Sequence, residues 1–186
     1  SNLVGAIRDA LMRDPSRLLT ERVLDECRII IGPCGATSLL DGLGQVMSPG
    51  TVITTDPMYY IYCEYLWRRG FQIVAVPEDE GGIRVDLLEK RLAELVKRRG
   101  TLRFLYVVTV NNPSCTILAN DRRRRLVEIA TWLSRDAKHT VPVIFDRAYE
   151  DLIHDPDVEP PTSALPFDEI EQQIADFANC AHLARE

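Results

Sequence analysis

The chain has 186 residues, of which 46% are hydrophobic and 27% charged, and its formal net charge is −6. This composition is typical of a globular protein with one substantial core and excludes a disordered chain. The acidic balance argues against a nucleic-acid-binding surface and against binding to anionic membranes. The longest apolar runs are too short for a transmembrane helix.

Cysteine and histidine usage indicates a reduced, cytoplasmic protein without a zinc site. The five cysteines are scattered and form no C-x-x-C pair, and the three histidines are equally scattered. The N-terminus has no basic region followed by an apolar region and a cleavage site, so we expect no signal peptide.

Helical and strand-like patterns alternate along the chain. In order, the pattern predicts helices over 3–11 and 18–24, a strand over 28–31, a helix over 37–47, a strand over 51–55, a helix over 59–70, a strand over 71–77, a helix over 85–99, a strand over 102–110, a helix over 121–136 and a strand over 141–145. The strands are apolar throughout, which favours a buried parallel sheet. The sequence therefore predicts an α/β fold of three layers, with a mostly parallel sheet and helices on both faces.

The pattern changes after residue 155. Residues 155–169 are rich in proline and acid and are expected to form a loop, and 170–186 are expected to form a last amphipathic helix. Arginines fill 122–125, but in an acidic protein a run at a helix start indicates a solvated face rather than a nucleic-acid patch.

In an open parallel sheet, ligands bind beyond the carboxyl ends of the strands, and four segments of this chain place unusual residues there. The first, "GPCGATS" at 32–38, joins a strand to a helix. Its glycines permit close backbone approach, and the N–H groups at the helix start suit a phosphate. The segment fits neither a Walker loop nor G-x-G-x-x-G, and an ordinary β–α turn is the alternative.

The second and third segments offer an aromatic side chain and an amide. In "DPMYYIY", Tyr59 or Tyr60 stands at the sheet edge, where its ring can lie on a ring-shaped ligand; core packing is the alternative. In "VVTVNNPSC", Pro113 favours an extended backbone at Asn112, whose amide can then donate across the strand ends. A capped turn is the alternative for Asn112.

The fourth segment is "VPVIFDRAYEDL", in which Asp146 directly follows a buried strand and Tyr149 lies three residues later. An uncompensated buried charge costs several kcal/mol or is lost by protonation. Asp146 is therefore solvated at the sheet rim, paired with an internal cation, or placed to receive a ligand that carries a cation.

Taken together, the four segments resemble the class I/II aminotransferases, fold-type-I enzymes that use pyridoxal 5'-phosphate. The resemblance runs from about Leu3 to about Asp168 and rests on "GATSLL…MSPGTVITTDPMYYIY", "NNPSC" and "FDRAYEDL". It implies a cofactor-binding, large-domain portion over 1–170 and a C-terminal helix or tail over 171–186.

The resemblance also implies roles for matching positions. The phosphate would be held by backbone N–H groups of Cys34, Gly35 and Ala36, and Tyr59 would stack on the pyridine ring. Asn112, helped by Tyr149, would bind the phenolic oxygen of the ring. Asp146 would pair with the protonated ring nitrogen, so that the ring can draw electrons from the α-carbon of an amino acid. No metal site is expected.

The sequence departs from the family pattern in three ways. Ser114 and Cys115 replace the usual Thr and Gly of "N-N-P-T-G", and Cys115 costs backbone strain if that position needs a positive φ. The family's Schiff-base lysine follows the Asp-Tyr strand in "S-x-S-K", whereas Lys90, Lys97 and Lys138 all precede Asp146. No catalytic residue is therefore assigned, and the substrate-carboxylate arginine of the family's C-terminal domain is absent too.

The resemblance predicts an aminotransferase, or a truncated piece of one that is inactive alone, which moves an amino group from an amino acid to a 2-oxo acid. It also implies a homodimer. Two alternatives stay open. One is another pyridoxal-phosphate reaction, such as that of a C–S lyase. The other is a non-catalytic module, either a pseudoenzyme or the effector domain of a transcription regulator.

Overall fold

The computed structural model describes residues 3–15, 18–32, 34–97, 101–137, 139–164, 174–177 and 181–184. The helices are α1 Leu3–Met12, α2 Glu21–Asp25, α3 Gly35–Val46, α4 Tyr60–Arg68, α5 Val85–Lys97 and α6 Asn120–Ala137, with a 3₁₀ turn, η2, at Glu150–Leu152. The strands are β1 Cys27–Ile30, β2 Thr51–Asp56, β3 Gln72–Asp79, β4 Gly82–Ile83, β5 Leu102–Val108, β6 Val143–Asp146, β7 Ile174–Phe177 and β8 Ala181–Ala184.

The strands form one sheet in the order β1-β8-β7-β6-β5-β2-β3-β4. The pairs β6–β7, β5–β6, β2–β5 and β2–β3 are parallel, and the pairs that involve β8 or β4 are antiparallel. Because β8 runs against both β7 and β1, these two strands point the same way. The carboxyl ends of β1, β2, β5 and β6 therefore lie at one edge of the sheet.

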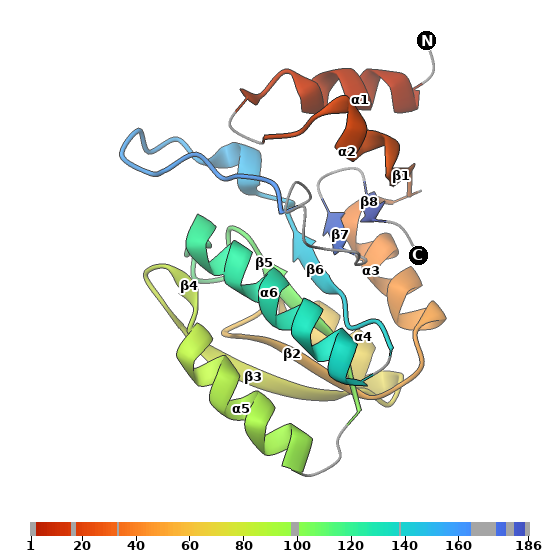
Figure 1. Ribbon diagram of the computed structural model, residues 1–186, viewed down its shortest axis with the longest axis vertical. Coiled ribbons are helices and arrows are strands. Elements are labelled where there is room, and N and C mark those ends of the chain that lie inside the picture. The colour runs from red at the N-terminus through yellow and green to blue at the C-terminus, as the bar shows by residue number, and fades with distance from the viewer. Residues whose placement is uncertain are drawn as a thin grey trace.

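Helices cover both faces of the sheet, so the expected three-layer, mostly parallel architecture is confirmed (Figure 1). Alternate residues of β5 divide between two cores: Leu105 packs with residues of α5 and α6, and Phe104 and Tyr106 pack with residues of α3 and α4. In β2, Val52 likewise packs in the core with α3 and α4, and Ile53 packs in the core with α5 and α6. Strands buried on both faces explain the unbroken apolar runs of the sequence.

The last part of the chain departs from the sequence pattern. An amphipathic helix was expected over 170–186, but Ile174–Phe177 and Ala181–Ala184 are strands. β7 pairs in parallel with β6, with Phe177 opposite Asp146. Short apolar runs do not distinguish a strand from a helix by periodicity, so the helix prediction is wrong for these eight residues. The rest of 170–186 lies outside the described residues.

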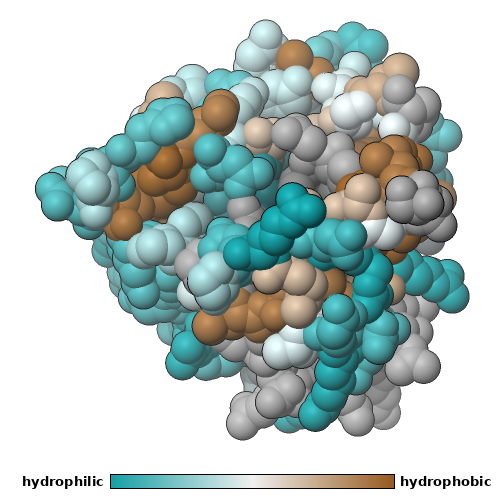
Figure 2. All heavy atoms as spheres, turned by 90° about the horizontal axis from the view of Figure 1, so that it is seen from above, coloured by the Kyte–Doolittle hydropathy of each residue, from teal (hydrophilic) through white to brown (hydrophobic). Residues whose placement is uncertain are grey.

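The first helix is less buried than the later ones. α1 has no fully buried residue, and Arg8 ties it to α2 through Glu21 and Asp25, each at 2.7 Å. Seen from the end at which α1 lies, apolar side chains show at the surface in several patches between hydrophilic ones (Figure 2). Within the described residues, no helix is both long and apolar enough to cross a membrane.

Candidate functional site

Three of the predicted site residues follow neighbouring strands. Tyr59 comes after β2 and caps α4, Asn112 comes after β5, and Asp146 is the last residue of β6. In the sheet order these strands are β6-β5-β2. Tyr59 and Asn112 are half-buried. The structure thus brings an aromatic ring, an amide and a carboxylate to one stretch of the sheet edge.

The predicted phosphate loop begins α3 at the same edge, after β1. The helix starts at Gly35, two residues earlier than predicted, with φ +66°. Among the residues that the structure describes, no side chain comes within 4 Å of the point where a side chain of Gly35 would begin. Glycine therefore permits both the left-handed backbone and an open approach to the helix start. The Cys34 amide already donates to Ser38 Oγ at 3.2 Å.

Asp146 is only 4% exposed, and each of its carboxylate oxygens accepts a hydrogen bond. The Tyr106 hydroxyl donates to Oδ2 at 2.9 Å, and the Ala148 amide donates to Oδ1 at 3.0 Å. Hydrogen bonds to the ionised form favour it over the protonated form. The site therefore holds a buried carboxylate in one orientation at a strand end.

Sequence reasoning missed Tyr106. It is fully buried in β5, and its ring meets that of Tyr62 edge-on, with centroids 4.7 Å apart and planes at 64°. Burial, with the nearby Asp146 charge, raises the pKa of both tyrosine hydroxyls well above the ordinary value. A buried tyrosine hydroxyl usually has a hydrogen-bond partner. A tyrosine inside an apolar strand could therefore have indicated a polar contact at this position.

Asn111 was missed as well. It is buried beside the predicted Asn112, and its amide donates to the Pro57 carbonyl at 2.8 Å and to Glu78 Oε2 at 2.9 Å. Thr116 Oγ donates to the other oxygen of Glu78 at 3.2 Å. These bonds tie together the ends of β2, β3 and β5, which fixes the backbone that carries Tyr59 and Asn112.

Tyr149 and the turn after β6 lie next to a second buried carboxylate, that of Glu150. Tyr149 is 40% exposed and precedes η2, whose first residue, Glu150, is 3% exposed. Glu150 pairs with Arg147 and with Arg123, whose Nη1 lies 2.8 Å from Oε1. The Thr109 hydroxyl also donates to Glu150, at 3.3 Å. This cluster anchors the Asp146–Tyr149 turn to α6.

Cys115 has the strained backbone that its replacement of glycine suggested. Its φ is +60°, and its side chain is exposed in the turn after Asn112. The left-handed region disfavours residues with a Cβ.

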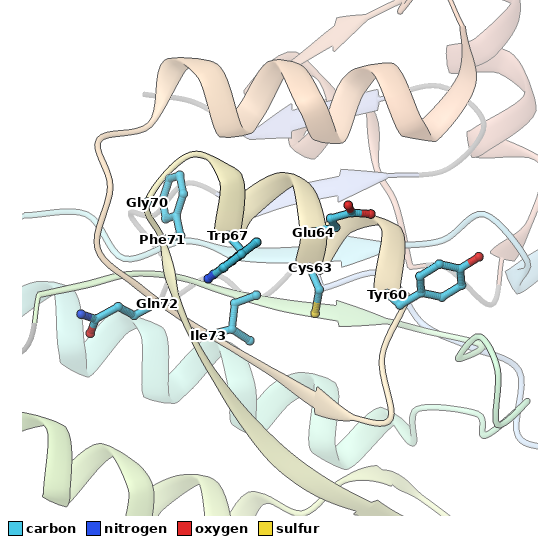
Figure 3. A pocket seen from close by; sticks show the side chains of 8 residues that line it. All are labelled: Tyr60, Cys63, Glu64, Trp67, Gly70, Phe71, Gln72 and Ile73. Carbon is cyan, nitrogen blue, oxygen red and sulfur yellow. The ribbon is translucent and has the colours of Figure 1, made fainter.

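A separate hollow lies along the outer side of α4, lined by Tyr60, Cys63, Glu64, Trp67, Gly70, Phe71, Gln72 and Ile73 (Figure 3). Tyr60 is 72% exposed, so core packing is wrong for this residue. Gln72 and Ile73 lie at the start of β3. The hollow therefore extends away from the carboxyl ends of the strands, where the predicted site residues lie. Among the described residues, no group of three or more His, Cys, Asp or Glu side chains is placed to hold a metal ion.

Comparison with known proteins gives a consistent set of relatives. A family model described as "Aminotransferase class I and II" matches residues 15–180. Aromatic-amino-acid aminotransferase 1 of Thermococcus litoralis is 32% identical over 105 residues, 55% of this chain and 25% of that protein. An archaeal alanine:glyoxylate aminotransferase superposes with TM-score 0.66 at 27% identity, over 87% of this chain and 40% of that one.

A further solved structure, the multiple substrate aminotransferase from Thermococcus profundus, has TM-score 0.69 and 23% identity, over 92% of this chain and 45% of that one. The chain thus spans less than half the length of each of these three proteins. The family match covers most of the chain, and the fold agrees with it. The chain belongs to the class I and II aminotransferases, a family of enzymes that depend on pyridoxal 5'-phosphate.

Proposed function

We propose that the protein is a pyridoxal-phosphate-dependent aminotransferase and that this chain supplies its cofactor-binding edge. The observation that carries the proposal is Asp146, a buried carboxylate held at the end of β6 by the Tyr106 hydroxyl and the Ala148 amide. A negative charge kept at a strand end suits a ligand with a protonated ring nitrogen. The open start of α3 suits the phosphate of the same ligand.

The residues present fit this cofactor. The backbone of Gly35 and Ala36 would hold the phosphate, joined by the Cys34 amide in exchange for its bond to Ser38 Oγ. Tyr59 would lie on the ring, and Asp146 would hold a proton at the ring nitrogen. Asn112 and Tyr149 would bind the phenolic oxygen. When bound, the cofactor supplies an acceptor for the electrons of the α-carbon of an amino acid. We propose an amino acid and a 2-oxo acid as substrates and a homodimer as the assembly.

The direct test uses pyridoxamine 5'-phosphate, which has no aldehyde and cannot react with lysines. Calorimetric titration of Asp146→Asn should give an affinity at least about tenfold weaker than that of the wild type, since a charge-assisted hydrogen bond is lost. Asp157→Asn, in an exposed loop, removes the same charge far from the strand ends and should leave the affinity unchanged. Equal affinities of Asp146→Asn and wild type would contradict the proposal.

A second test concerns catalysis. The three lysines, Lys90, Lys97 and Lys138, all precede Asp146. We predict that a polypeptide of these 186 residues alone does not transaminate. Borohydride reduction after mixing with pyridoxal 5'-phosphate should then label these lysines partially and unselectively, as mapped by mass spectrometry. Stoichiometric labelling of one lysine, with amino-acid-dependent turnover, would contradict this prediction.

A further inference from the structure

We propose that Tyr106 is a positioning residue for the cofactor: its hydroxyl fixes the Asp146 carboxylate and keeps it ionised for the ring nitrogen. The inference rests on the proposed function, because it gives Tyr106 a role only through Asp146. It assigns a purpose to a fully buried side chain that the family motifs do not include.

The register of the sheet places the two side chains together. Tyr106 lies opposite Ile144, and Val108 lies opposite Asp146, in the parallel β5–β6 pair. Residues two apart on a strand share a face, so Tyr106 and Asp146 are diagonal neighbours on the α3–α4 side. The resulting bond of 2.9 Å joins residues 40 positions apart in the chain.

Packing prevents the hydroxyl from turning away. The Tyr106 ring is held edge-on by Tyr62 and lies in the core cluster that also contains Phe104 and Ile144. With the Ala148 amide on the other oxygen, the carboxylate is fixed at both ends. The orientation of Asp146 is therefore set before any ligand arrives.

The surroundings of Asp146 show what else acts on its charge. Tyr106 from β5 and Tyr62 from α4 face it and are neutral at physiological pH, since the pKa of each is raised by burial. On its own segment, Arg147 pairs with Glu150, which also pairs with Arg123 of α6.

Two more titratable groups act on these tyrosines. The charge of Asp41 on α3 reaches Tyr62, and Tyr59 acts on Tyr106. Substitutions at Tyr62 and Tyr106 leave all of these groups in place.

Loss of the Tyr106 hydroxyl has a specific consequence. A hydrogen bond to the ionised form lowers the pKa of a carboxyl group, so its removal in a buried site raises that pKa. Protonated Asp146 cannot pair with a protonated ring nitrogen. Tyr106→Phe should therefore bind pyridoxamine 5'-phosphate nearly normally at pH 8 and lose affinity at a higher pH than the wild type does on acidification.

The experiment measures the dissociation constant of pyridoxamine 5'-phosphate between pH 5 and 8. The acidic limb is the pH range in which the affinity falls on acidification. In Tyr106→Phe we expect this limb to lie about one pH unit higher than in the wild type, so that the variant binds about tenfold more weakly within it. The matched control is Tyr62→Phe, which removes an equally buried hydroxyl that has no hydrogen-bond partner among the described residues; its profile should match the wild type. Protonation of the ligand's phosphate group affects the affinity of every variant equally, so it does not contribute to the differences between their pH profiles.

The outcomes separate the two proposals. An affinity loss in Tyr106→Phe that is equal at every pH, or a profile identical to the wild type, overturns the role of Tyr106. If Asp146→Asn binds as tightly as the wild type, the proposed function fails instead. Should Tyr106→Phe not fold, 3-fluorotyrosine placed at position 106 alone keeps the shape and donates more strongly. It should move the limb to lower pH, and an unmoved limb overturns the inference.

Discussion

Two buried carboxylates, Asp146 and Glu150, lie four residues apart and are stabilised by different chemistry. Glu150 contacts two guanidinium groups, those of Arg147 and Arg123. Asp146 accepts hydrogen bonds from a phenol and a backbone amide, both neutral. The guanidinium groups cancel the charge at Glu150, whereas the phenol and the amide stabilise the charge of Asp146 without adding a positive one.

This difference distinguishes the Glu150 carboxylate, which stabilises the fold, from the Asp146 carboxylate, which is suited to bind a ligand. Glu150 links η2, the end of β6 and α6, and its partners are anchored in the fold. Asp146 ends its strand at the edge where parallel sheets bind ligands. Removing Glu150 should therefore affect folding alone, whereas changing the surroundings of Asp146 should affect both the stability of the fold and the binding of the ligand.

The largest expected effect is on stability at Glu150. Glu150→Gln leaves two buried guanidinium groups without their shared countercharge, which should lower the free energy of unfolding by about 3–5 kcal/mol. Urea denaturation measures this. Glu64→Gln is the control, because Glu64 pairs with Arg68 at the surface of α4 and should cost less than about 1 kcal/mol. Similar losses for the two variants would show that Glu150 does not stabilise the fold more than a surface carboxylate does.

The next effect concerns the two tyrosines. Tyr106→Phe removes a donor from a charged group and should cost about 1.5–3 kcal/mol of unfolding free energy. Tyr62→Phe removes a buried hydroxyl that has no hydrogen-bond partner among the described residues, so its cost should be near zero. Equal costs, measured by the same denaturation, would show that the Tyr106–Asp146 bond adds nothing.

The same tyrosines predict instability at alkaline pH. The pKa of each is raised in the folded protein, so above the unfolded value of about 10 the unfolded chain loses protons that the folded protein keeps. Their stabilisation is complete below pH 10 and decreases as pH rises, by about 1.4 kcal/mol per pH unit for each tyrosine. The double variant Tyr62→Phe/Tyr106→Phe should show a shallower loss between pH 10 and 11, and an unchanged slope would contradict this.

The smallest effect is at Cys115. Its φ of +60° favours glycine, so Cys115→Gly should raise the melting temperature by about 2–4 °C, equivalent to about 1 kcal/mol. Cys115→Ala removes the thiol and keeps the Cβ, and it should leave the melting temperature unchanged. A gain in the alanine variant equal to that in glycine would assign the effect to the thiol rather than the backbone.

Local sequence patterns predicted much of the fold, because strands buried on both faces produce unbroken apolar runs and the helices between them have clear periodicity. They also pointed to Asp146, since a carboxylate after a buried strand is unusual. Tyr106 and Asn111 were missed because each depends on a partner distant in sequence, at Asp146 and at Pro57 and Glu78. Only the strand register decides such contacts. The strands at 174–177 and 181–184 were missed because their role comes from pairing with β6 and β1.

The proposed function depends above all on Asp146 binding the ring nitrogen of the cofactor. A crystal structure of the chain with pyridoxamine 5'-phosphate tests it most directly. We predict that the ring nitrogen lies about 2.6–3.2 Å from an Asp146 oxygen and that the phosphate lies at the start of α3. A ligand bound elsewhere, for example in the hollow between Tyr60 and Trp67 along α4, with Asp146 untouched, would contradict it.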